Sequence, residues 1–139
     1  MAKRHRIFGT TADVGVDSFG LNVKEAFESQ AAGMFSIMTD LRLVRPKEPF
    51  SVEAEGSDLE GLLFAWLNEL LYLYDTERVF LRKFEITSIE DKRLKARAYG
   101  ERIDRGRHLV KTEVKAVTYH MLEVRKTKDG VSTRVVYDI

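Results

Sequence analysis

Residues 57–74 read SDLEGLLFAWLNELLYLY, and their apolar side chains recur at the spacing of an α-helix. Ser57 and Glu60 stand in the relation of a capping box, and Asp58 suits the positive end of the helix dipole. The sequence therefore predicts a helix that begins near Ser57 and packs on a core. Its buried face collects Leu59, Leu62, Leu63, Trp66, Leu67, Leu70, Leu71 and Tyr74, whereas Phe64 and Leu73 lie off this stripe and favour a second contact.

A second helix is predicted over residues 22–39, where Asn22 and Glu25 resemble a helix cap. Pro46 and Pro49 follow it and prevent a helix from continuing into the next segment. Gap filling between helix and sheet explains its Met and Phe stripe better than a ligand site does. The stripe consists of Val23, Ala26, Phe27, Ala31, Met34, Phe35 and Met38.

The remaining segments alternate apolar and polar residues, which is typical of strands buried on one side. Residues 50–54 and 94–99 show this alternation. A third strand, over residues 80–86, is predicted to join the 94–99 strand through a turn at residues 90–92. Residues 102–112 are rich in charge and are expected to form a mobile loop.

The C-terminal region predicts a long strand over residues 113–126 and a hairpin turn at Asp129-Gly130. If Lys128 pairs with Val131, then Met121 lies opposite Asp138 and His120 opposite Ile139. The chain would then end inside a sheet. Together these elements predict an α+β fold: a single two-layer domain over residues 1–139, with two amphipathic helices packed on a mostly antiparallel sheet.

Composition excludes several classes of function. The 139 residues carry 23 Lys and Arg against 22 Asp and Glu, so a general polyanion binder is not indicated. The absence of cysteine excludes disulfides, thiolate zinc sites and thiol nucleophiles. No stretch approaches the roughly 20 apolar residues of a membrane span, and no signal region follows the basic start, so we expect a cytoplasmic protein.

Standard catalytic motifs are absent from the sequence. Its clustered basic residues and its histidines are better explained by structural roles than by chemistry. Arg102, Arg105, Arg107, His108 and Lys111 could contact phosphates, but a solvated loop is favoured because acids dilute the charge and no aromatic residue is interleaved. His120 is expected to be a hydrogen-bonded core residue on its strand, and both His5 and His108 are expected at the surface.

The end of the chain offers two adjacent anions, the Asp138 side chain and the α-carboxylate of Ile139. Clustered carboxylates need a counter-ion, and a hard divalent cation with oxygen ligands would supply it. Asp13 would add a third carboxylate. The alternative is a chain that simply ends in exposed polar residues.

Several ordered motifs resemble the archease family over nearly the whole chain. They are Thr11-Ala12-Asp13-Val14-Gly15, Met38-Thr39-Asp40, residues 62–72, residues 112–120 and the terminal Asp138-Ile139. The resemblance implies a single archease-like domain over residues 1–139. It also implies a non-catalytic accessory protein of tRNA splicing that activates an RtcB-type RNA ligase by promoting its nucleotidylation and multiple turnover, and that meets tRNA only indirectly.

The resemblance further implies a divalent metal site on Asp13, Asp138 and Ile139, the last through its C-terminal carboxylate. Calcium is the expected ion, with magnesium or manganese as alternatives. Asp40 and Lys115 match family positions and are candidate activation or partner contacts. Family members commonly carry His where this chain has Thr10, so no role for that imidazole is transferred.

Two other functions compete with ligase activation. A chaperone-like modulator of a tRNA cytosine-5 methyltransferase would use Phe64, Tyr72 and Leu73 as partner contacts. An independent metal-dependent hydrolase is disfavoured, because no general base can be named beside the carboxylates.

Overall fold

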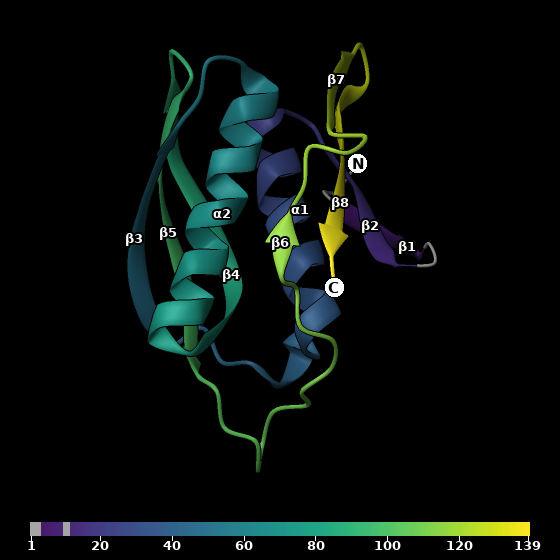
Figure 1. Cartoon of the computed structure of the whole chain (residues 1–139). Coiled ribbons are helices and arrows are strands. Elements are labelled where there is room, and N and C mark those ends of the chain that lie inside the picture. Colours follow the sequence, from purple (N-terminus) through teal and green to yellow (C-terminus); the bar gives the residue numbers. More distant parts are fainter. Residues whose placement is uncertain (1–3, 10–11) are drawn as a thin grey trace.

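The chain forms two helices and two antiparallel sheets in a computed structural model that describes residues 4–9 and 12–139 (Figure 1). The predicted α+β class with two helices is therefore confirmed. In chain order the elements are β1 (Arg4–Gly9), β2 (Asp13–Gly20), α1 (Val23–Met38), the short 3-10 helix η1 (Leu41–Leu43), β3 (Glu48–Glu55), α2 (Leu59–Glu77), β4 (Val79–Glu90), β5 (Arg93–Arg102), β6 (Ala116–Val117), β7 (Glu123–Thr127) and β8 (Gly130–Asp138).

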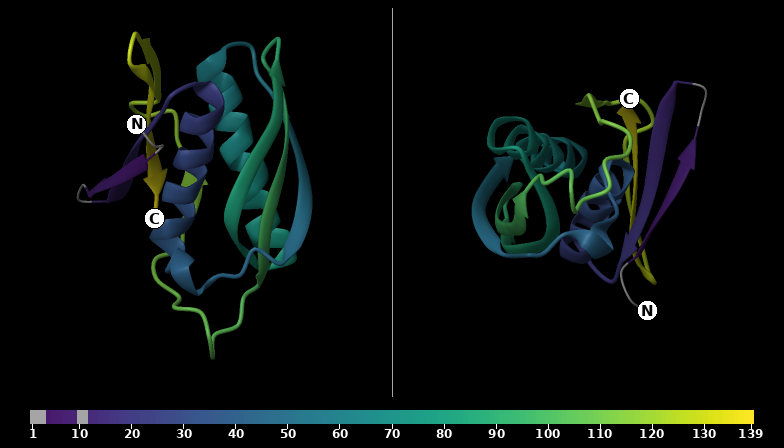
Figure 2. Two further views of the ribbon diagram at one scale, coloured as in Figure 1. Left: turned by 180° about the vertical axis from the view of Figure 1, so that it is seen from behind. Right: turned by 90° about the horizontal axis from the view of Figure 1, so that it is seen from below.

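The strands divide into two sheets, where the sequence suggested one. The larger sheet has five strands in the order β1-β2-β8-β6, with β7 also paired to β8, and the smaller has the order β3-β5-β4. The helices lie between the sheets (Figure 2), and α1 contacts strands of both. The smaller sheet forms a layer of its own because α1 packs against its edge strand β4 and so separates it from the larger sheet. The chain then passes from β5 to the larger sheet through an irregular connection.

Helix α1 begins where its cap predicts. The Asn22 side chain accepts a hydrogen bond from the Glu25 N–H at 2.9 Å, and the Glu25 carboxylate accepts one from the Leu21 N–H at 3.0 Å. Phe27, Met34 and the rest of the predicted stripe are buried or half-buried against the core. This helix forms the centre of the molecule.

Helix α2 is confirmed, but its predicted capping box is wrong. Asp58, not Ser57, is the N-cap, and its carboxylate accepts from the Gly61 N–H at 2.7 Å. Glu60 accepts instead from the Val124 N–H at 3.2 Å, which ties the start of α2 to β7. The Trp66 indole N–H donates to the Phe27 carbonyl at 3.0 Å and joins the two helices.

Both predicted hairpins form, but only one of them has the predicted turn. Asp91 and Lys92 both have positive φ and make the predicted turn between β4 and β5. A hairpin forms here as predicted, but its turn consists of residues 128–129 and not of Asp129-Gly130, because Gly130 opens β8 and pairs with Thr127. The partner of Val131 is therefore Lys126, two residues from the predicted Lys128.

The single long strand over residues 113–126 is wrong. Its residues form β6 and β7, separated by a turn in which Met121 has a φ of 58°. Tyr119 stacks on Phe64 of α2 with ring centroids 3.9 Å apart, so this turn packs on the helix. As a result Ala116, not Met121, pairs with Asp138, and His120 is an exposed turn residue and not a core histidine.

Within the described ranges, neither helix is long and apolar enough to cross a membrane.

Candidate metal-binding site

The strand register places Asp13 directly opposite Asp138. Asp13 opens β2 and Asp138 closes β8, and the two residues are antiparallel partners. Directly paired residues project to the same face of a sheet, so the two carboxylates are neighbours there. Asp138 also pairs with Ala116 of β6 on its other side. β8 is thus an inner strand, as the sequence suggested, and it ends between two neighbours.

The donor set at this corner suits a hard cation. Carboxylate oxygens are the ligands that calcium, magnesium and manganese prefer, and two neighbouring carboxylates repel each other unless a cation is shared. Ile139, which follows Asp138, is half-buried against the core, so the backbone after β8 is held at the same corner. The residues present therefore fit the implied ion.

A complete site of side chains is not formed by the described residues alone. Among residues 4–9 and 12–139, no group of three or more His, Asp or Glu side chains could hold a metal ion. Asp13 and Asp138 would supply two ligands to such an ion, and further oxygens would have to come from backbone, terminus or solvent. Thr10, where the family commonly has His, lies outside the described residues.

Lys115 is brought to this corner. Its backbone N–H donates to the Asp138 carbonyl at 2.8 Å, and its side chain is exposed. An exposed lysine side chain can reach a bound partner.

Asp40 follows α1, and its carboxylate binds groups of this same chain. Its carboxylate caps η1 by accepting from the Arg42 N–H at 3.0 Å, and it forms a two-point ion pair with the Arg42 guanidinium. Hydrogen bonds from Arg42 lower the pKa of Asp40 to about 2. Asp40 therefore stays ionised. It does not form a three-acid group with Asp13 and Asp138 among the described residues.

The loop after β5 holds a buried ionic cluster that the sequence did not predict. The Nε2 of His108 lies 2.9 Å from Glu101, and its Nδ1 accepts from the Asp104 N–H at 3.0 Å, so we assign the Nε2 proton as the donor to Glu101. Arg107 pairs with the same carboxylate. The surface position expected for His108 is therefore wrong, whereas His5 is exposed as expected. Inward residues of β5 are even-numbered, so alternation gave no sign that Glu101 is buried.

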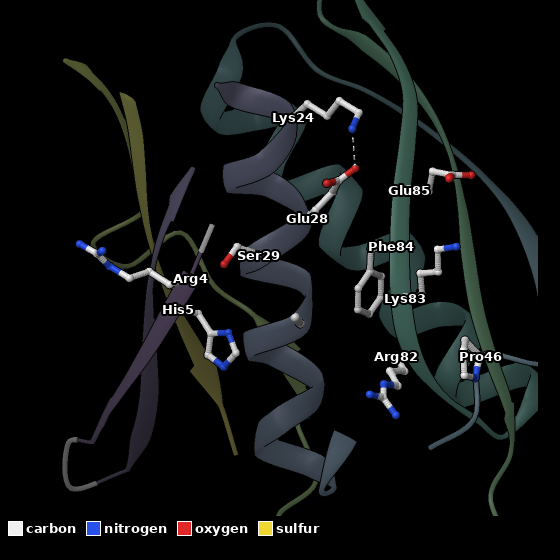
Figure 3. Close-up of a pocket in the computed structure, with 11 residues that line it drawn as sticks. Arg4, His5, Lys24, Glu28, Ser29, Pro46, Arg82, Lys83, Phe84 and Glu85 are labelled. Carbon is white, nitrogen blue, oxygen red and sulfur yellow. Dashed lines mark ion pairs between the residues drawn. The ribbon is translucent and has the colours of Figure 1, made fainter. Parts of the chain in front are cut away.

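A hollow of about 720 Å³ lies elsewhere, between α1, β1 and β4 (Figure 3). Its charged lining is already engaged. Glu28 accepts from the Ile86 N–H at 2.8 Å and pairs with Lys24 at 3.3 Å, and Lys83 lies over the Tyr99 ring at 5.0 Å. The Asp13–Asp138 corner, and not this hollow, is therefore the candidate site.

Comparison with known proteins agrees with the resemblance seen in the sequence. Residues 5–139 match the model of the Archease protein family. Protein archease of Pyrococcus abyssi is 41% identical over 131 residues, which cover 92% of each chain.

Solved structures share the fold. The solution structure of protein 1598 of Methanobacterium thermoautotrophicum superposes with a TM-score of 0.85 at 39% identity and covers 97% of this chain and 98% of its own. An archease from Thermotoga maritima, at 20% identity and a TM-score of 0.59, covers 96% of each chain and supports the fold alone. With its paired strand-end aspartates and near full-length agreement, the chain belongs to the archease family.

Proposed function

We propose that this chain is a non-catalytic protein cofactor of an RtcB-type RNA ligase in tRNA splicing, which promotes nucleotidylation of the ligase and its multiple turnover. Members of the family are generally accessory proteins without catalysis of their own. The observation that carries the proposal is the pairing of Asp13 with Asp138 at an open strand end. We further propose that these two side chains and the Ile139 α-carboxylate hold a divalent cation, calcium by preference.

The chain's own residues create a compact negative corner that a partner can reach. Asp138 is exposed and Asp13 half-exposed, and the β2–β8 ladder fixes their spacing. A divalent ion bound there would neutralise phosphoryl oxygens and orient groups of the partner. Lys115 beside Asp138 and Asp40 at the end of α1 are the proposed contacts for the ligase.

The decisive experiment measures joining of RNA halves by the ligase of the same organism at high substrate excess. Wild type should raise the number of turnovers, and Asp13→Asn should lose most of the stimulation. Asp75→Asn, an exposed aspartate on α2, is the matched control and should stimulate as wild type does. Full stimulation by Asp13→Asn would refute the acidic corner, and none by wild type would refute the cofactor role.

The metal is tested separately by calorimetric titration of calcium and magnesium into chelator-stripped protein. Asp138→Asn should abolish the binding heat, because it removes one of two paired carboxylates. Adding one glycine after Ile139 moves the α-carboxylate without changing any side chain, and it should weaken binding at least tenfold. Heat that is unchanged by both variants would place the ion elsewhere.

A second candidate is a chaperone-like modulator of a tRNA cytosine-5 methyltransferase, supported by an exposed aromatic residue on α2. Tyr72 is 64% exposed, whereas Phe64 is stacked on Tyr119 and Leu73 packs on the core. The Thermotoga maritima archease has been described as a possible chaperone. Under this proposal Tyr72→Asp abolishes co-elution with the methyltransferase in size exclusion, and Asp138→Asn is tolerated. Under ligase activation, Asp138→Asn loses stimulation of the ligase and Tyr72→Asp keeps it.

A further inference from the structure

The five-stranded sheet has one face that no described element covers. Both helices lie on its other side (Figures 1 and 2), where Val16, Val135 and Tyr137 are buried in the core. The alternation is visible at the start of β1, because His5 extends toward α1 and Arg4 extends away from it (Figure 3). We call the uncovered side, which includes Arg4, the outer face.

Strand register arranges the outer face in rows. One row joins Arg4, Phe19, Ser132 and Arg125 across β1, β2, β8 and β7. The next joins Arg6, Asp17, Arg134 and Glu123 in the same strand order. A third places Phe8 opposite Gly15, and the Asp13–Asp138 pair closes the same face at its end.

The two phenylalanines of the outer face carry arginines on their rings. The Arg4 guanidinium lies 5.2 Å from the Phe19 ring centroid, and the Arg134 guanidinium lies 4.8 Å from that of Phe8. The Phe8 ring covers Gly15 so closely that a Cβ at that position would collide with it. Both phenylalanines remain half-exposed, so each arginine–ring pair presents planar groups to solvent.

The arginines outnumber the acids in the first two rows. Asp17 is paired with Arg134 at 2.7 Å and with Arg6 at 3.2 Å, and Glu123 is paired with Arg125 at 3.1 Å. Arg4, Arg6, Arg125 and Arg134 thus exceed Asp17 and Glu123 by two positive charges. The Asp13–Asp138 pair adds two negative charges at the far end of the face, so the positive excess is confined to the rows of Arg4 and Arg6.

We infer that the outer face binds single-stranded nucleic acid, with bases stacking on the Phe8 and Phe19 pairs and phosphates contacting Arg4 and Arg6. Unpaired bases stack on aromatic and guanidinium planes, and open sheets with aromatic residues on neighbouring strands use this mode. Duplexes keep their base faces covered and would leave both phenylalanines unused. A cation at the Asp13–Asp138 end would offset the negative charge of the two acids that close this face.

The test is fluorescence anisotropy of a labelled ten-nucleotide RNA of mixed sequence, titrated with the whole chain in 50 mM KCl. Wild type should bind, and Phe19→Leu should weaken binding about fivefold or more because a base loses its stacking partner. Arg4→Ala should also weaken it and reduce its salt dependence, by about 0.7 in the slope of log affinity against log salt. DNA of the same sequence, duplex RNA and polyphosphate are parallel probes.

Arg97→Ala is the control, because Arg97 is an exposed arginine on β5 of the other sheet. It should leave RNA affinity unchanged, and circular dichroism should show that every variant is folded. The inference is overturned if neither RNA nor DNA binds, if polyphosphate binds as tightly as RNA, or if Phe19→Leu and Arg4→Ala act no more than Arg97→Ala. No ligase is present, so these outcomes are independent of the proposed ligase function.

Discussion

Glu101 shows how one buried carboxylate holds a loop. Only 5% of it is exposed, and it accepts from the Arg45 N–H at 2.8 Å besides contacting Arg107 and His108. Burial alone would raise the pKa of Glu101, but the hydrogen bonds from Arg107, Arg45 and His108 outweigh it and lower the pKa to about 2. The residues that follow β5 are therefore anchored by an ion cluster, whereas their charge predicted a mobile loop.

This lowered pKa predicts a defined loss of stability in acid. A carboxyl that is more acidic in the folded state stabilises the fold above its unfolded pKa, and this is lost as pH falls from about 4.5 toward 2. We expect Glu101→Gln to lower the free energy of unfolding by about 2 kcal/mol at pH 6. In urea unfolding, the difference from wild type should shrink toward pH 2; a difference independent of pH would contradict the ionic role.

Gly100 is required by a close backbone approach. A Cβ at this position would collide with the Phe80 carbonyl of the paired strand, which cannot move without distorting β4. We expect Gly100→Ala to lower the midpoint of thermal unfolding, at a cost of about 2 kcal/mol. Gly106→Ala is the control in the exposed loop, where the nearest atom is the flexible Asp104 carboxylate, and it should change the midpoint little.

Helix α2 offers a direct test of which residue caps it. Asp58 accepts the Gly61 N–H, while Ser57 is outside the helix. Asp58→Ala should destabilise the protein by about 1 kcal/mol, and Ser57→Ala should have almost no effect. Chemical unfolding of both variants decides which residue is the N-cap, since the capping-box interpretation requires Ser57→Ala to be the more destabilising of the two.

Elements with strong local periodicity were predictable, and those determined by distant partners were not. Both helices and the β4–β5 hairpin follow from spacing and turn residues such as Asp91. The break between β6 and β7 depends on Tyr119 stacking on Phe64 of α2, which alternation over residues 113–126 cannot reveal. At the site, Asp13 and Asp138 were named from their carboxylates and from the resemblance, but their direct pairing is set by the β2–β8 register, which the sequence did not predict.

At the scale of the whole molecule, the two sheets should unfold together. The helices contact both sheets, and Trp66 is fully buried between them with its indole bonded to Phe27. We expect Trp66 fluorescence and far-ultraviolet circular dichroism to report the same urea midpoint. A fluorescence change that precedes the loss of dichroism would indicate that one sheet opens alone and would contradict a single domain over residues 1–139.

The inner position of β8 has a consequence for synthesis. β1 and β2 leave the ribosome first, yet the five-stranded sheet cannot assemble until residues 130–138 arrive to pair with β2, β6 and β7. Until then β2 presents an open edge to the crowded surroundings of a nascent chain. The acidic corner, built from the first residue of β2 and the last of β8, thus comes into being only on chains whose translation has run to the end of β8.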